Sequence, residues 1–114
     1  MGDFIEVGDT KVDVDEDGFI QKWDDWSEDA ASVLAKTENV DELTKEHWVV
    51  VNYLREYYTQ YKIAPMIRLV LKETGKRLGQ EKAVSNKYIY ELFPSGPAKG
   101  ACKIAGLPKP TGCV

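Results

Sequence analysis

The most regular hydrophobic pattern in the chain lies between residues 44 and 61. Four side chains recur there at steps of three and four, which predicts a helix with one buried stripe. They are Trp48, Val51, Leu54 and Tyr58. Four more widen the stripe, namely Val50, Tyr53, Tyr57 and Tyr61. Thr44 suits the N-cap, because its hydroxyl oxygen can accept from an amide of the first turn. We expect this segment to be the central helix of the fold.

Two further helices flank this segment. One is predicted to begin after Ser27, with two carboxylates in its first turn. Its apolar side is Ala30, Ala31, Val33 and Leu34. The other is predicted to begin at Pro65, whose missing N–H costs nothing in a first turn, and to end at Gly75 or Gly79. Its core face is Met66, Ile67, Leu69, Val70 and Leu71.

Two short helices are predicted after these. Asn86 is expected to cap a helix over Lys87–Phe93. Pro97 is expected to open a last helix over Ala98–Ala105, which Gly106 closes.

A β-hairpin is predicted at the start of the chain. Its strands are Phe4–Val7 and Lys11–Val14, Gly8-Asp9 supplies the turn, and a third extended piece is expected at Phe19–Ile20. The fold class is therefore expected to be mainly α with a small N-terminal hairpin. We expect one domain over residues 1–106, with the hairpin region at 1–26 and a helical bundle at 27–106. Two prolines and a glycine follow, so residues 107–114 are expected to form a flexible C-terminal arm.

Composition narrows the class of protein. The 114 residues are 43% hydrophobic and 30% charged, which fits one folded domain. No run of about 18 apolar residues occurs, and the start lacks the basic and apolar regions of a signal peptide. We therefore expect a cytoplasmic protein that does not span a membrane. Residues 1–61 carry a net charge of −11 and residues 62–114 one of +7. The basic half is either a solvated surface or a face that docks an acidic partner or an anion.

The two cysteines, Cys102 and Cys113, are the candidate chemistry. Ten residues separate them, and Cys113 is the penultimate residue. One interpretation is a structural disulfide, although such bonds are rare in the cytosol. Another is two unrelated thiols, with Cys102 buried as a small hydrophobic side chain. The third is a redox pair on a pliable arm, with no large share of core packing on either thiol.

Length and charge favour the pliable arm. Eleven steps of extended chain span at most about 36 Å, so Cys113 can reach into a partner's cleft. Folded back, it can meet Cys102 once the two Cα atoms are within about 7 Å. Lys99, Lys103 and Lys109 are expected to favour the thiolate form and to attract anionic sulfur species. The terminal carboxylate beside Cys113 is expected to oppose both effects, and the sequence leaves their balance open.

The last third of the chain carries a long, specific motif. It reads KYIYELFPSGPAKGAC over residues 87–102 and AGLPKPTGCV over residues 105–114. Shorter motifs precede it: DEDGF at 15–19, EHW at 46–48, LREYY at 54–58 and IAPMIR at 63–68. On these residues, which cover nearly the whole chain, the sequence resembles the DsrC family.

The resemblance implies a mostly helical, orthogonal bundle with a helix-turn-helix-like core. It implies a sulfur carrier, not catalytic alone, that serves as co-substrate of dissimilatory sulfite reductase. Cys113 matches the cysteine that reaches the partner's active centre, and Cys102 the one that joins it in holding a sulfur atom as a trisulfide. A membrane-bound thiol–disulfide system is the implied reductant. No cofactor or metal is expected on this chain, whereas the α and β subunits of the partner are expected to carry siroheme and iron–sulfur clusters.

The same resemblance implies roles for basic residues. Arg68 is expected to bind an anion or the carboxy terminus near the retracted arm, with a plain surface arginine as the alternative. Lys99, Lys103 and Lys109 are expected to contribute to partner docking or anion binding.

Two other functions stay open. A sister branch related to TusE relays sulfur toward transfer RNA thiolation and typically lacks the first cysteine, so the presence of Cys102 favours the sulfite reductase branch. A helix-turn-helix DNA-binding regulator is the other candidate, although the acidic first half would repel a polyanion, so nucleic acid is not an expected partner.

Two metal-site patterns are weak. Asp13–Gly18 copies the opening of a calcium loop, but its twelfth position is Asp24 rather than glutamate. His47, the sole histidine, cannot complete a four-ligand zinc site with two distant cysteines. We expect His47 to be a packing or capping residue. The three tryptophans, Trp23, Trp26 and Trp48, are expected to be core aromatics.

Overall fold

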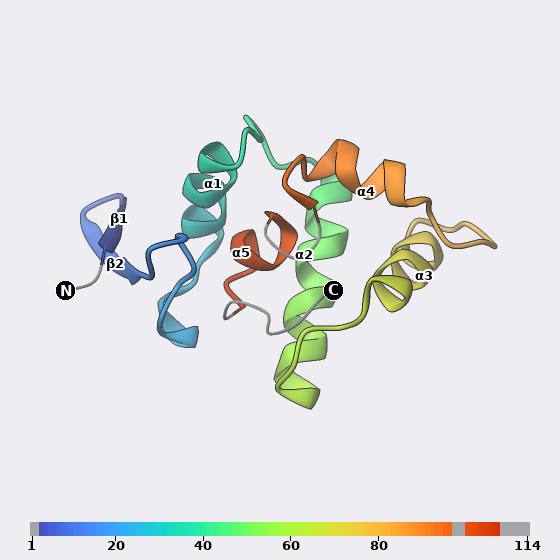
Figure 1. The fold of residues 1–114 in the computed structure, drawn as a ribbon, viewed down its shortest axis with the longest axis horizontal. Coiled ribbons are helices and arrows are strands. Elements are labelled where there is room, and N and C mark those ends of the chain that lie inside the picture. Colours follow the sequence, from blue (N-terminus) through green and yellow to red (C-terminus); the bar gives the residue numbers. More distant parts are fainter. Residues whose placement is uncertain (1–2, 97–99, 108–114) are drawn as a thin grey trace.

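The structure is a computed structural model that describes residues 3–96 and 100–107. Its elements are β1 (Asp3–Val7), β2 (Thr10–Val14), the 3-10 helix η1 (Trp23–Asp25), α1 (Glu28–Thr37), α2 (Lys45–Tyr61), α3 (Ile67–Arg77), α4 (Asn86–Leu92) and α5 (Cys102–Ile104). The hairpin lies at one end of the molecule, α5 lies between α1 and α2, and α3 lies on the far side of α2 (Figure 1). This confirms the predicted fold class, while the helix-turn-helix-like character of the core stays a prediction.

The hairpin forms as expected, and a tight turn follows it. β1 and β2 pair antiparallel, with Ile5 opposite Val12. The inner positions of β2, Val12 and Val14, are buried. The third extended piece is reduced to one bridge between Val14 and Ile20. In the turn, Asp15 Oδ1 accepts from the amides of two later residues at 2.9 Å each, so the carboxylate stabilises the turn itself.

Side-chain caps set the starts of α1 and α2. Ser27 Oγ accepts from the amide of Ala30 at 3.1 Å, as predicted for the first helix. Thr44 and His47 form a reciprocal capping box: the amide of Thr44 donates to His47 Nδ1 at 3.0 Å, and Thr44 Oγ1 accepts from the amide of His47. The capping role predicted for His47 is therefore confirmed.

The buried face of α2 differs slightly from the prediction. The buried residues are His47, Val50, Val51 and Leu54. Trp48 and Tyr58 are half-buried, as are Trp23 and Trp26. α5 packs against one side of α2 and α3 against another, while these large aromatic rings stay partly exposed to solvent.

The third helix differs more. It begins at Ile67 with Met66 as N-cap, so Pro65 precedes it, and Gly79, with φ +80°, follows its end. Its buried residues are Val70, Thr74 and Gly75, whereas Met66 is 56% exposed. The position of Gly75 accepts no side chain, because a Cβ there would overlap the Lys82 carbonyl oxygen of the following loop.

The fourth helix is capped one residue earlier than predicted. Ser85 Oγ accepts from the amide of Tyr88 at 3.1 Å, so Asn86 is the first helical residue rather than the cap.

The core runs from the hairpin to α5. Leu107, predicted as the first residue of the arm, is fully buried, so the described chain stays packed one residue further than expected. The division into a domain and an arm otherwise falls on residues outside the described ranges. In the described ranges, no helix is both long and apolar enough to cross a bilayer.

Candidate functional site

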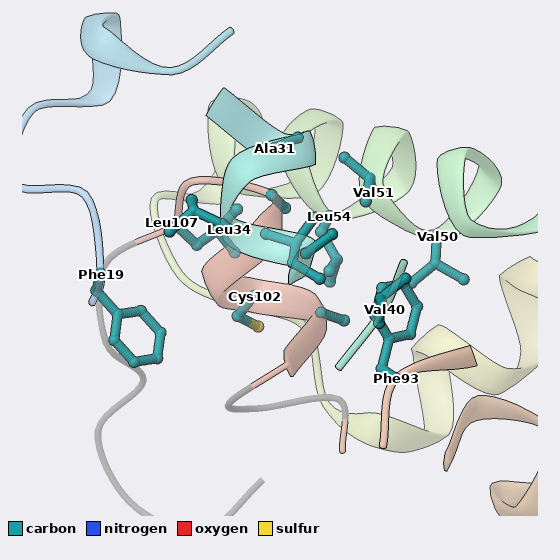
Figure 2. Close-up of a cluster of buried hydrophobic side chains, with 14 of the residues drawn as sticks. Phe19, Ala31, Leu34, Val40, Val50, Val51, Leu54, Phe93, Cys102 and Leu107 are labelled. Atoms are coloured by element: carbon teal, nitrogen blue, oxygen red, sulfur yellow. The ribbon is translucent and has the colours of Figure 1, made fainter. Parts of the chain in front are cut away.

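Cys102 is the first residue of α5 and is 2% exposed. It carries a free thiol and belongs to the main hydrophobic cluster. Figure 2 shows its sulfur in the middle of the drawn side chains, which come from α1, α2, α5 and the neighbouring loops. The small residues that flank this short helix, Ala101 and Ala105, are fully buried and allow α5 to approach α1 and α2 closely. The sulfur is therefore part of the core.

Burial governs the chemistry of this thiol. Desolvation raises the pKa of Cys102 from 9.0 to about 12, because a thiolate in apolar surroundings lacks hydration. This direction is opposite to the one expected from nearby lysines, and the described lysine, Lys103, pairs with Glu38. The expectation that the Cys102 side chain carries little packing is wrong, because the sulfur is nearly inaccessible to solvent.

Lys103 follows Cys102 and is itself almost buried. Its Nζ donates to Glu38 Oε2 at 3.2 Å, and the two side chains are 11% and 14% exposed. The lysine stem also passes Gly18, where a Cβ would lie 2.5 Å from Lys103 Cε. Lys103 thus ties α5 to the end of α1 and to the loop after β2. This position gives no support to the predicted docking role of its ammonium group.

Where the chain leaves α5, side chains from distant segments donate hydrogen bonds to its backbone carbonyl groups. Trp26 Nε1 donates to the carbonyl oxygen of Ile104 at 2.8 Å, and Arg55 Nη1 donates to that of Ala105 at 2.8 Å. Gly106 then adopts φ +78°, and the amide of Leu107 donates to the carbonyl oxygen of Cys102 at 3.0 Å. We call this segment, residues 104–107, the root of the arm.

Arg55 is held from more than one side. Its Cζ lies 3.9 Å from the ring centroids of both Trp23 and Trp26. Desolvation lowers its pKa somewhat, but an arginine stays charged at neutral pH. The role of Arg55 at the root was missed, although LREYY at 54–58 was singled out as a motif. That motif was the available signal, because the tryptophans are too distant in sequence to indicate the contact.

A surface hollow lies beside the root. It has a volume of about 610 Å³, and its lining includes Trp26, Arg55, Glu56 and Arg77. Arg77 donates to both oxygens of Glu56 at 2.9 and 3.0 Å and to Glu73 at 3.1 Å. Since Arg77 is paired with carboxylates and Arg55 with a carbonyl oxygen, the hollow is not a ready anion site.

Among the other predicted site residues, Arg68 is described by the structure and lies apart from Cys102. Arg68 is exposed on α3, across α2 from α5 (Figure 1). Cys113, Lys99 and Lys109 lie outside the described residues. Their predicted roles, and that of Arg68, stay predictions.

Comparison with known proteins identifies a family and several relatives of this chain. Residues 6–114 match the family described as "DsrC like protein". The chain is 46% identical over 102 residues to the dissimilatory-type sulfite reductase subunit gamma of Nitratidesulfovibrio vulgaris, covering 90% of each chain. It is 45% identical over 103 residues to the sulfurtransferase TusE of Yersinia pseudotuberculosis, covering 90% of this chain and 94% of that one.

A solved structure agrees with the fold. The crystal structure of the oxidised gamma subunit of the dissimilatory sulfite reductase from Archaeoglobus fulgidus superposes with a TM-score of 0.88 at 47% identity. The match covers 98% of this chain and all of that one. With the family match over nearly its full length, this chain belongs to the DsrC-like family.

Proposed function

We propose that this chain is a sulfur carrier and co-substrate of a dissimilatory sulfite reductase, with Cys113 as the delivering thiol and Cys102 as the resolving thiol. The observation that carries the proposal is the family match over residues 6–114, which spans both cysteines, together with a relative named as a sulfite reductase gamma subunit. In this proposal siroheme and iron–sulfur clusters belong to the partner's α and β subunits, and the carrier works in the cytoplasm.

The proposed chemistry balances with two thiols. A sulfur atom at the +2 level, held by the reductase with two hydroxyl equivalents, reacts with the thiols of Cys113 and Cys102. Two S–S bonds form, two water molecules leave, and the product is a trisulfide. Four electrons and four protons from a membrane-bound thiol–disulfide reductase then release hydrogen sulfide and restore both thiols.

The burial of Cys102 supports its resolving role. A thiol that is 2% exposed, with a pKa of about 12, reacts slowly with oxidants and electrophiles in solution. It becomes a nucleophile when α5 opens locally, and a neighbouring arm is then the reactant with the highest local concentration. The thiol that meets the partner is accordingly assigned to Cys113.

A single-turnover experiment with purified reductase α and β subunits, sulfite and a two-electron reductant, which takes sulfite sulfur from the +4 to the +2 level, tests the proposal. The parent protein is expected to yield a product in which the peptides carrying Cys102 and Cys113 are joined. Compared with the two reduced peptides, its mass is expected to be higher by one sulfur and lower by two hydrogens. Cys113→Ala is expected to abolish capture of sulfur. Cys102→Ala is expected to capture sulfur on Cys113 without forming the intramolecular product. Variants that both behave like the parent would overturn the assignment.

A second function has one specific observation in its favour, the 45% identity to a TusE sulfurtransferase. In a relay of that type, Cys113 alone would accept and pass on a persulfide sulfur. The Cys102→Ala variant separates the two functions, because it would keep full transfer in a TusE-type relay and lose product release in the sulfite reductase cycle.

A further inference from the structure

Besides its local backbone hydrogen bonds, the root of the arm is held by three contacts from residues that are distant in sequence. Trp26 and Arg55, which lie 78 and 50 positions before their acceptors, donate to the carbonyl oxygens of Ile104 and Ala105. A side chain at Gly106 would collide with Trp26, because a Cβ there would overlap its indole ring. The indole therefore rests directly on the backbone where the chain turns away from α5.

These contacts satisfy the carbonyl groups that a short helix cannot satisfy itself. α5 has three residues, so its last carbonyls lack partners within the helix. A side-chain donor at each of two successive carbonyls stops the end of α5 from fraying. Since Cys102 begins this helix and its own carbonyl accepts from Leu107, loosening the root also loosens the backbone around the sulfur.

The two side chains that donate to the root, Arg55 and Trp26, are themselves held in place. The guanidinium group of Arg55 lies 3.9 Å from both indole rings, so the two donors, Arg55 and Trp26, hold each other in place. Trp23 in turn stacks on Tyr58 of α2, with ring centroids 4.9 Å apart. The donors are thus fixed by η1 and α2 rather than by the arm.

We propose that Arg55 and Trp26 are positioning residues that clamp the root of the arm, and that release of this clamp is the step that makes the Cys102 sulfur available to Cys113. The reaction between Cys102 and Cys113 in this inference rests on the proposed function. The contacts of Arg55 and Trp26 with the root lie within this chain and can be tested without a partner.

Alkylation of Cys102 in the reduced protein measures the opening directly. In a Cys113→Ala background the thiol of Cys102 is the sole target for iodoacetamide, and its rate reports how often the sulfur is uncovered. Trp26→Phe keeps a ring and removes the donor, and Arg55→Lys keeps a charge and removes the planar group. Each is expected to raise the alkylation rate roughly tenfold, the effect of losing about one buried hydrogen bond.

Two control variants separate clamping from general stability. Val70→Ala removes core volume from α3, on the far side of α2, and Arg77→Lys changes an arginine of the same hollow that contacts Glu56 and Glu73 instead of α5. Rates are compared at equal global stability, adjusted with urea. Faster alkylation in the clamp variants than in both controls supports the proposal. Equal rates at equal stability would overturn it, since Cys102 would then open only by global unfolding.

Closure of the disulfide gives a second readout with both cysteines present. Oxidised glutathione and the Cys113 thiol give a mixed disulfide and one reduced glutathione. Attack by the Cys102 thiolate then forms the intramolecular bond and releases the second glutathione. The clamp variants are expected to accelerate the second step and leave the first unchanged. A second step no faster than in Val70→Ala would contradict the proposal. Because no reductase is present, failure of the sulfur-carrier function would leave this result intact.

Discussion

His47 Nε2 lies 2.7 Å from the carbonyl oxygen of Leu92, which joins the first turn of α2 to the end of α4. The other ring nitrogen, Nδ1, accepts from the amide of Thr44 at 3.0 Å. Since one nitrogen accepts, Nε2 carries the proton and donates to Leu92, which defines the neutral tautomer. One buried side chain thus caps a helix and fastens a second one.

The two contacts of His47 can be separated by substitution. His47→Gln keeps the capping-box type of residue at the third helical position and loses the bond to Leu92, so it is expected to cost about 1–2 kcal/mol of unfolding free energy. His47→Ala loses both contacts and is expected to cost about 2–3 kcal/mol. Urea unfolding followed by circular dichroism measures both. Equal losses in the two variants would show that the bond to Leu92 contributes little.

The nearly buried ion pair between Lys103 and Glu38 is expected to have a larger effect on the free energy of unfolding. Lys103→Met is expected to cost about 3 kcal/mol, because it leaves the Glu38 carboxylate without its partner in a site that is 14% exposed. The double variant with Glu38→Met is expected to be more stable than Lys103→Met by itself, since no charge is left buried. A double-mutant cycle gives the coupling between the two side chains. Additive losses would mean that the pair is solvated in solution.

Cys102 should give the protein a stability slope at alkaline pH. Its pKa is about 12 in the folded state against an ordinary 9.0, so between these values the unfolded chain releases the thiol proton while the folded chain keeps it. The folded state then binds more protons, and the free energy of unfolding falls as pH rises above 9, by up to about 1.4 kcal/mol per pH unit. The stability difference between a Cys113→Ala parent and its Cys102→Ala derivative isolates this slope. A difference that is constant from pH 8 to pH 10.5 would contradict the burial.

Substitution of Cys102 also tests its place in the core at neutral pH. Cys102→Ala removes one buried sulfur and is expected to cost about 1 kcal/mol. Cys102→Ser is expected to cost about 2 kcal/mol despite its similar size, because the hydroxyl is buried among apolar neighbours. Thermal unfolding of the two variants in the reduced state measures the order. A Cys102→Ser variant that is as stable as the Cys102→Ala variant would indicate that water reaches the site.

Local sequence patterns determined most of the secondary structure. Ser27 and Thr44 cap helices where their hydroxyls predict it, and Val51 and Leu54 of the predicted stripe of α2 are buried. These features depend on neighbours within one helical turn, so the amino-acid order suffices. The family motif, which pointed to Cys102 and Cys113, is likewise contained in the order of residues.

The state of each site residue was decided by tertiary packing. The sequence places Lys103 beside Cys102, yet the ammonium group of Lys103 pairs with Glu38, 65 positions earlier. The sulfur of Cys102 is buried in the core. Arg55 reaches Ala105 because α2 and α5 pack together, a contact with no short-range signal. Burial and long-range pairing set the charge, protonation and accessibility of a side chain, and they exist only once distant segments are folded against each other.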